Sequence, residues 1–466
     1  MLALVGLCLV AVFGFLLLSC AWGRSALSRG ERLALGYGVG LGVFTYLMFG
    51  ALAVGVRLSR LSILIALVTL SAALGLATWR WRGPSAFGAV GAPAAEPPAT
   101  SHVRHPGSAS LAAVIALVAL SLSALAVALY WPIWTWDALT MFDYRGRAIA
   151  VQQSLAFLRH EAYWGSFPLL TSLGHALVRV LDGTTPNVLY PLYYASLLAV
   201  FYLNVAKLSG GLAAAGFTVI VATTPLLWQH AAEPLTNLPF TFYYGVGTMY
   251  VYRWVVARER SHLLLGGLLM GLSAWTRYGS EPLVLAVAIP VTVCALRRRE
   301  PSAPVLFLLM FALVEAPWLL YQRYVLEVGP AYALYGVRAA LWDGPRLLRT
   351  LTYLSWFLGS VHTHGAVWLM FFVSLCLNAP RWRDPSTWLA GMTLLGLMAW
   401  TASIYLTVLS VEYLAPTSGE RLLLFLVPVA ALYCAVSPTA RRGAVALRPS
   451  SGWAGAVDAT SPGGGR

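Results

Sequence analysis

Charge is scarce in this chain. Asp, Glu, Lys and Arg make up only 10% of its 466 residues, whereas soluble globular domains carry about a quarter. Hydrophobic residues make up 59%. A soluble fold could not bury so much apolar sequence without exposing a large part of it to water. The low charge therefore excludes a soluble globular protein and favours one whose solvent is the lipid bilayer.

Uncharged runs such as 111–131 and 389–409 recur along the chain, and most approach the ~20 residues that a membrane-spanning helix needs. A hydropathy reading gives about 13 such spans. No basic residue precedes the first span, 2–21, and Arg24, Arg29 and Arg32 follow it, which predicts a retained anchor with its N-terminus outside rather than a cleaved signal peptide. The predicted fold class is all-α, a polytopic transmembrane helical protein.

Motifs of soluble nucleotide-binding enzymes are missing: the sequence has no P-loop and no GxGxxG segment after a strand. The five cysteines are scattered through apolar runs without metal-ligand spacing, so we interpret them as packing residues. An enzyme of this design has to take an activated substrate from the membrane or from the outer space.

The net charge of +14 reflects topology rather than a nucleic-acid partner. Basic clusters at 253–260, 297–299, 381–383 and 441–442 fall on one side when the spans alternate. This asymmetry is the positive-inside pattern, and it orients the protein. Arg57 and Arg60 are exceptions, because they fall on the outer side. The pattern predicts a multi-pass protein of a bacterial-type inner (plasma) membrane.

Composition divides the chain into four parts. Residues 1–82 form an N-terminal three-span block, and 83–109, rich in Ala, Pro, Gly and Ser, read as a flexible cytoplasmic linker. Residues 110–437 form the transmembrane core, and 438–466 read as a disordered cytoplasmic tail. Two outer loops are long, 132–186 and about 324–349. Within the first, 144–160 and 168–181 have the periodicity of amphipathic helices on the membrane interface.

Asp137 is the leading candidate for chemistry. It follows a tryptophan-rich segment, 131–136, where a span leaves the membrane. Partial desolvation there would raise the pKa of the carboxyl group and suit it to accept a proton. The alternative is a solvated loop aspartate beside an aromatic belt.

Further candidates lie on the predicted outer side of the membrane, and one lies inside a span. Arg145 and Arg147 suit bidentate phosphate binding, or else they snorkel from an interfacial helix. Glu315, inside a span, is either functional or stabilises a kink at Pro317. His362 and His364 are a weak metal signal, and the sequence supports no metal site. The remaining candidates are Asp143, Glu233, Arg277, Glu281 and Arg421, the last of which could instead form a local ion pair with Glu420.

Several segments in order resemble the GT-C glycosyltransferase superfamily. The segment 136–148 (WDALTMFDYRGRA) resembles its first-loop motif, and 166–170 and 233–240 resemble later loop segments. The segment 267–277 is similar to a glycine-rich helix that ends in Thr-Lys or Thr-Arg, and 316–318 and 421–428 match later landmarks. The likeness covers about residues 111–437. It is nearest to the dolichyl-phosphate-mannose protein mannosyltransferase-like group (glycosyltransferase family 39) and the lipid A aminoarabinose transferase.

The resemblance implies a GT-C-like core and an inverting transfer of a sugar from a polyprenyl-phosphate donor to an extracytoplasmic hydroxyl of a lipid, glycan or protein. Asp137 would be the general base. Arg145, Arg147, Arg277 and Arg421 would bind the donor phosphate, with Asp143, Glu233 and Glu281 as supporting acidic residues. Asn237 stands where the family often has Asp, and Arg277 where it has Lys, so the metal requirement stays open.

A non-catalytic reading is a flippase or transporter of a lipid-linked sugar. It also needs a basic outer patch and an intramembrane carboxylate such as Glu315. A positioned base at Asp137 discriminates between the two, because translocation does not require one.

Overall fold

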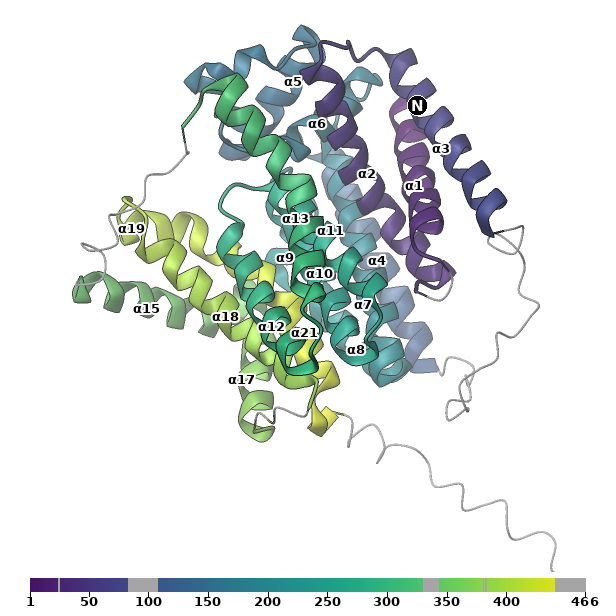
Figure 1. Cartoon of the computed structure of the whole chain (residues 1–466). Coiled ribbons are helices and arrows are strands. Elements are labelled where there is room, and N and C mark those ends of the chain that lie inside the picture. Colours follow the sequence, from purple (N-terminus) through teal and green to yellow (C-terminus); the bar gives the residue numbers. More distant parts are fainter. Residues whose placement is uncertain (24–25, 83–107, 330–342, 380, 382–383, 441–466) are drawn as a thin grey trace, which may run out of the picture.

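The computed structural model of the chain describes residues 1–23, 26–82, 108–329, 343–379, 381 and 384–440, and these fold into helices without a strand (Figure 1). Most of the predicted linker and tail lies outside the described residues. In the N-terminal part the helices are α1 (Leu2–Ala21), α2 (Arg29–Ala53), α3 (Arg60–Arg82), α4 (Ser108–Tyr130), η2 (Ala138–Phe142), α5 (Asp143–Gln152), η3 (Ala156–Arg159), η4 (Glu161–Tyr163), α6 (Leu170–Val180), η5 (Pro186–Val188), α7 (Leu189–Ser209), α8 (Gly211–Ala222) and α9 (Pro225–His230).

The second half continues with α10 (Asn237–Ala257), α11 (Arg260–Thr276), α12 (Glu281–Arg298), α13 (Ser302–Tyr321), η6 (Gln322–Leu326), α15 (Gly344–Gly359), α16 (Val361–His364), α17 (Val367–Leu377), α18 (Ser386–Tyr405), α19 (Val411–Leu414), η7 (Ala415–Gly419), α20 (Glu420–Leu423), η8 (Leu424–Leu426) and α21 (Val427–Val436). Among the described residues, eight helical segments are long and apolar enough to cross a membrane. The fold is that of a multi-pass helical membrane protein, and the larger predicted number of spans stays a prediction.

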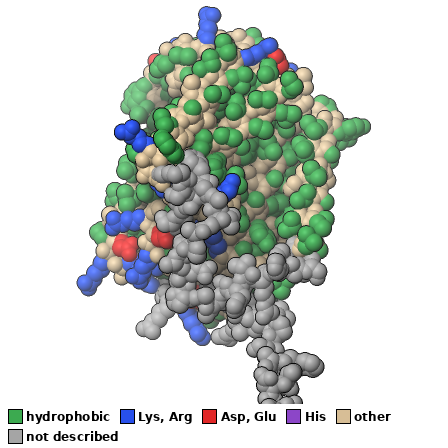
Figure 2. Space-filling model, turned by 90° about the vertical axis from the view of Figure 1, so that its right-hand side faces the viewer, with side chains coloured by type: hydrophobic (Ala, Val, Ile, Leu, Met, Phe, Trp, Pro, Cys, Tyr) green, Lys and Arg blue, Asp and Glu red, His purple; other side chains and the backbone are tan. Residues whose placement is uncertain are grey.

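Exposed apolar side chains show which surfaces lie against lipid. On α3, Leu61, Ile65, Val68 and Leu76 are exposed, and α4 exposes a similar row. Hydrophobic side chains cover most of the face in Figure 2, while Arg and Lys side chains gather toward its upper and lower ends. Such a surface would aggregate in water but is stable in hydrocarbon. The positions of the exposed apolar side chains therefore confirm the prediction, made from composition, of a membrane protein.

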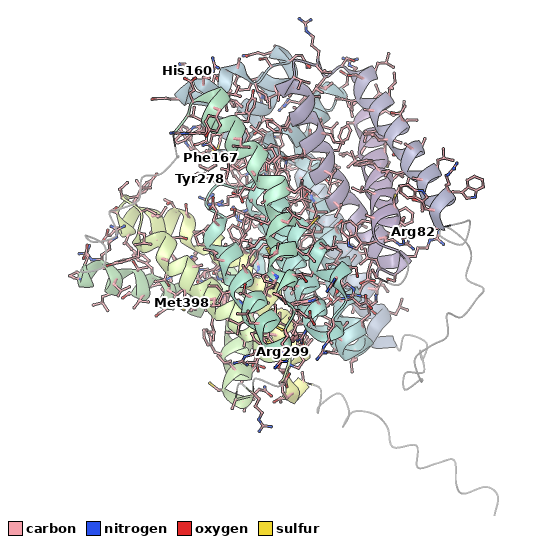
Figure 3. All side chains as sticks on the ribbon, in the orientation of Figure 1. Arg82, His160, Phe167, Tyr278, Arg299 and Met398 are labelled. Carbon is pink, nitrogen blue, oxygen red and sulfur yellow. The ribbon has the colours of Figure 1, made fainter. Side chains whose placement is uncertain are left out.

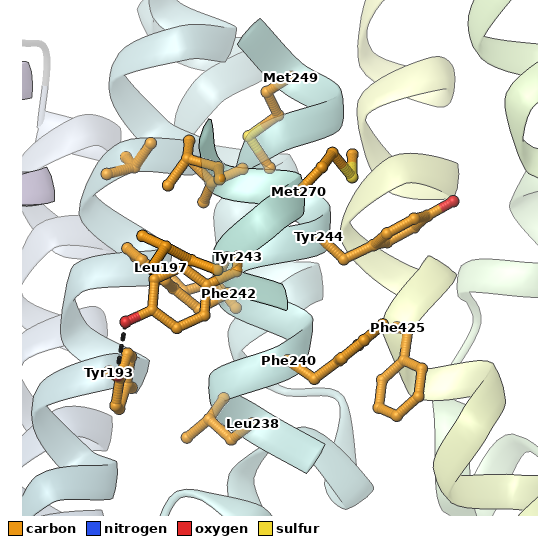
Figure 4. Packing of buried hydrophobic residues seen from close by; sticks show 14 of the residues in the cluster. Tyr193, Leu197, Leu238, Phe240, Phe242, Tyr243, Tyr244, Met249, Met270 and Phe425 are labelled. Atoms are coloured by element: carbon orange, nitrogen blue, oxygen red, sulfur yellow. Dashed lines mark hydrogen bonds between the residues drawn. The ribbon is translucent and has the colours of Figure 1, made fainter. Parts of the chain in front are cut away.

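Aromatic residues of α7, α10 and η8 fill the centre of the bundle. The hydroxyl groups of Tyr193 and Tyr243 lie 2.7 Å apart, and Tyr243 also donates to the Gly38 carbonyl of α2. The rings of Phe240 and Phe425 pack with centroids 4.2 Å apart (Figure 4). Buried tyrosines need hydrogen-bond partners, and these bonds fix α10 against both neighbouring parts of the bundle.

Helices α1 and α2 approach closely through glycine. A Cβ atom on Gly40 would lie 2.1 Å from the Val10 carbonyl oxygen, and one on Gly14 would lie 2.0 Å from the Gly36 carbonyl oxygen. Small residues permit this backbone contact, which gives membrane helices much of their packing energy.

We therefore expect Gly40→Val to destabilise the protein by about 1–3 kcal/mol or more, because the backbones must move apart. The measurement is the free energy of unfolding, or the thermal midpoint, in detergent micelles. Gly50→Val is the matched control, since a Cβ on this α2 glycine meets nothing within 4 Å. An equal loss of stability in the two variants would mean that helix propensity, and not the contact with α1, sets the effect.

The first long loop was predicted to form two amphipathic helices on the membrane interface, and the structure differs from that prediction. The first helix, α5, ends at Gln152 rather than near residue 160, because Gln153 adopts a left-handed conformation with φ of 54°. The second, α6, is buried from Leu170 to Val178 and packs between α5 and α2. Its apolar face thus packs against protein, and its polar residue His175 reaches a buried carboxylate. This loop is a packed cap on the bundle (Figure 1).

Candidate functional site

A cavity of about 720 Å³ opens at the end of the bundle below this cap. Five separate parts of the chain line it: the exit of α4 with η2, the segment between η4 and α6, the α9–α10 turn, the end of α11, and the segment from the end of α18 to α20. Aromatic side chains form much of its wall, among them Trp136, Trp164, Phe167 and Tyr413. Figure 3 shows Phe167 beside Tyr278 at this position, and their ring centroids are 5.8 Å apart.

Asp137 and Arg421 form an ion pair inside the cavity. Arg421 Nη1 donates to Asp137 Oδ2 at 2.9 Å, and its other terminal nitrogen donates to the Thr417 carbonyl. The Asp137 side chain is 44% exposed and the Arg421 side chain 24%. Among the described residues, no protein donor reaches Asp137 Oδ1. That oxygen is therefore open to a hydroxyl group that enters the cavity.

A second guanidinium lies in the same cavity. Arg277 follows the last residue of α11, and its Nη1 donates to Asn237 Oδ1 at 2.9 Å and to Thr236 Oγ1 at 3.3 Å. Its guanidinium carbon lies 5.6 Å from the centroid of the Phe425 ring. The aromatic face and the two oxygen acceptors hold the cation in one orientation.

Hydrogen bonds extend from Arg277 through Asn237 to a buried histidine. Asn237 Nδ2 lies 3.4 Å from His230 Nε2, and His230 Nδ1 lies 3.2 Å from Glu233 Oε2. Gln229 donates to Glu233 Oε1 at 2.9 Å. With the proton on Nδ1, His230 accepts from Asn237 and places its N–H near Glu233. Both Glu233 oxygens thus face protein donors, so this carboxylate is less available to a ligand than Asp137.

The charge states of His230 and Glu233 follow from their surroundings. Burial lowers the pKa of His230, and this outweighs the attraction of Glu233. Burial alone would raise the pKa of Glu233, but the hydrogen bonds from His230 and Gln229 and the charge of Arg421 hold it below its ordinary value. Near neutral pH His230 is therefore neutral and Glu233 is ionised.

Two predicted phosphate ligands lie outside the cavity. Arg145 is fully buried and donates to the carbonyls of Trp164 (3.3 Å), Phe167 (2.9 Å) and Pro168 (3.2 Å). Burial lowers its pKa to about 9, which still leaves it charged at neutral pH. Arg145 thus supports the wall of the cavity from behind. Arg147 turns away from it and pairs with Asp143.

The three predicted supporting acidic residues do not all lie in the cavity. Asp143 is buried, accepts from Arg147 Nε at 2.7 Å and Arg179 Nη2 at 2.6 Å, and lies 3.3 Å from His175 Nδ1. Burial would raise its pKa, but His175 and Arg179 hold it well below its ordinary value. Glu281 is the first residue of α12 and does not belong to the lining of the cavity. Of the three, only Glu233 lines the cavity.

The histidine pair His362 and His364 is placed apart from the cavity lining. His364 is buried, and its ring nitrogens lie near the Phe357 and Glu420 carbonyl oxygens. Within the described parts of the chain, no group of three or more His, Cys, Asp or Glu side chains has a metal-binding arrangement.

Sequence reasoning missed part of the lining. It noted His230 only as a neighbour of Glu233 and Asn237 as the residue where the resembling family often has Asp, and it did not single out Tyr413 or Thr417. The one available signal was the polar and aromatic content of 410–420, which interrupts an otherwise apolar C-terminal region.

The fold and the cavity define a multi-pass helical membrane protein with a charged, aromatic-walled recess at one end of its spans. Comparisons with protein-family models, curated protein sequences and solved structures give no match.

Proposed function

We propose that this protein is a glycosyltransferase that moves a sugar from a polyprenyl-phosphate donor to a hydroxyl group of an acceptor, with inversion at the anomeric carbon. The observation that carries the proposal is the convergence of one accessible carboxylate, Asp137, and two guanidinium groups, Arg277 and Arg421, in a single cavity at the end of membrane-spanning helices. A base and two phosphate-binding cations are what this reaction needs.

In the proposed reaction, Asp137 Oδ1 accepts the proton of the acceptor hydroxyl as its oxygen attacks the anomeric carbon. The bond between that carbon and the phosphate oxygen breaks, and the electron pair leaves with the polyprenyl phosphate. Arg277 and Arg421 stabilise the additional negative charge on the departing phosphate. No atom or electron is needed from a further reactant. Arg145 and Arg147 have no place in this step, because they lie outside the cavity.

The exposed apolar surface of the bundle supports a lipid-linked donor. A polyprenyl chain can stay in the bilayer while its phosphate enters the cavity from the membrane surface. The aromatic walls, including Trp136 and Trp164, suit a sugar ring, whose C–H faces pack on aromatic rings.

Acceptor-dependent release of polyprenyl phosphate is the direct test. Purified full-length protein is incubated with polyprenyl phosphates that carry different radiolabelled monosaccharides, with and without a membrane extract as the source of acceptor. We expect release with one donor class, and transfer of label to the acceptor. If no donor is consumed, and protein in liposomes instead moves lipid-linked sugar between leaflets, the protein is a transporter and this proposal is wrong.

The positive-inside pattern predicts that the cavity faces outward, away from the cytoplasm. Single cysteines at Ala162 and Ser302 test this in a variant that lacks the five native cysteines. Both positions are exposed, and they belong to opposite ends of the bundle, near His160 and Arg299 in Figure 3. We expect an impermeant thiol reagent to label Ala162→Cys in intact cells, and Ser302→Cys only after permeabilisation. The reverse labelling would place the cavity on the cytoplasmic face.

A further inference from the structure

A second charged recess, of about 790 Å³, lies between the α2–α3 turn and helices α5 and α6. It shares no lining residue with the cavity described above. Three arginines from three different helices line it, namely Arg60 of α3, Arg147 of α5 and Arg179 of α6. The other lining residues are apolar or polar and uncharged: Leu58, Ser59, Leu61, Ala150, Val151, Gln153 and Val180. Guanidinium groups brought together from Arg60, Arg147 and Arg179 point to an anionic ligand.

The arginines have donors to spare. Arg147 donates through Nε to Asp143, and Arg179 donates through Nε and Nη2 to the same carboxylate. Arg60 pairs through Nη2 with Asp182 at 2.5 Å. Among the described residues, no protein acceptor takes either terminal nitrogen of Arg147 or the second terminal nitrogen of Arg60 or Arg179. Three cations face two carboxylates, so the recess keeps a net positive charge and unused donors.

Hydrogen bonds hold the recess in shape. The Leu58 amide of the α2–α3 turn donates to Gln153 Oε1 at 2.6 Å, and Gln153 Nε2 donates to the Ala150 carbonyl at 2.7 Å. Ser59 and Ser62 cap the start of α3 reciprocally, with each amide donating to the other hydroxyl group. A preformed site binds its ligand without a further ordering penalty.

The position of the recess selects a lipid as the ligand. It lies where α2 ends and α3 begins, and both helices are long and apolar enough to span the membrane. Beside the arginines, Val151 is 82% exposed, Val54 78% and Leu61 68%. These apolar side chains belong in hydrocarbon, so the arginines lie at the level of the headgroups. A soluble anion would gain nothing from the apolar rim.

We propose that this recess binds the phosphate headgroup of an anionic membrane phospholipid. The guanidinium groups of Arg60, Arg147 and Arg179 contact the phosphate oxygens, while the acyl chains lie along the exposed residues of α3 and α5. This assigns a role to Arg60, whose basic charge departs from the positive-inside pattern. It also means that Arg147 serves lipid binding rather than the cavity.

The test is lipid retention by the purified full-length protein. In native mass spectrometry from detergent, with equal phosphatidylglycerol and phosphatidylcholine, we expect the wild type to retain phosphatidylglycerol preferentially. The double variant Arg60→Gln/Arg147→Gln should weaken this binding about tenfold or more, since charge-assisted hydrogen bonds are lost from two guanidinium groups. Arg323→Gln, which changes an exposed arginine of η6, should bind as the wild type does.

Arg60→Gln alone covers the case in which the double variant does not fold, because it leaves Asp143 and its partners intact. It should weaken phosphatidylglycerol binding severalfold. Inorganic phosphate at millimolar concentration should not displace the lipid. Equal retention of the two lipids by the wild type, or unchanged retention by Arg60→Gln, would overturn the proposal. Displacement by inorganic phosphate would identify a site for soluble anions and would overturn it too.

Discussion

Asp137→Asn should lower the rate of sugar transfer by about 10²-fold or more, the usual scale for the loss of a general base. The amide keeps the size of the side chain, and its oxygen can still accept from Arg421, as Asp137 Oδ2 does now. What it loses is the ability to take a proton. We therefore expect kcat to fall while donor affinity and the thermal midpoint stay close to those of the wild type.

Glu233→Gln is the internal control for this assignment. Glu233 lines the same cavity, but its two oxygens face Gln229 and His230. We expect a smaller loss of rate from this variant, through altered positioning of Asn237 and Arg277. The assay is acceptor-dependent release of polyprenyl phosphate at saturating donor. Near-full activity of Asp137→Asn together with loss of activity in Glu233→Gln would move the base to the α9–α10 turn.

Arg277→Ala should weaken donor binding and lower kcat/KM by about 10²-fold, the range for removing one charge-stabilising donor. Arg277 has a defined orientation over Phe425, with Asn237 as its acceptor. Arg277→Lys should recover part of the loss, because an ammonium group supplies the charge but not the planar pair of donors.

Donor affinity is measured directly, by titration of the purified protein with polyprenyl phosphate. The matched control is Arg323→Ala, an exposed arginine outside the lining of the cavity. It should leave donor affinity and kcat/KM unchanged. If Arg277→Ala binds donor as tightly as the wild type, the phosphate is held by Arg421 alone or lies elsewhere.

The helical membrane fold could be predicted because apolar runs determine it locally. The predicted spans 2–21 and 111–131 correspond to α1 and α4 within a few residues. The structure of the loop that caps the cavity was harder to predict. Amphipathic periodicity shows that a helix has one apolar face, but it does not show whether lipid or protein covers that face. In α6 that face is covered by protein, and the helix is buried.

The same limit applies to the candidate site. Asp137, Glu233, Arg277 and Arg421 were singled out from sequence, and the structure places all four in one cavity. The sequence could not show that Asp137 pairs with Arg421, because 284 positions separate them. Nor could it place Arg145 and Arg147, since directions two residues apart on a helix differ by about half a turn. One arginine enters the protein interior and the other faces a different recess.

The ion pairs of Glu31 determine whether the N-terminal helices can be removed from the rest of the protein. Its buried carboxylate in α2 accepts from Ser28 and forms ion pairs with Lys207 of α7 and Arg253 of α10. A truncated chain that starts near residue 110 would leave both cations without this carboxylate. It would also remove the contacts of α2 with the buried Tyr193 of α7 and Tyr243 of α10. Residues 1–82 are thus one wall of the core rather than a removable appendage. An engineered minimal version of the protein has to keep them.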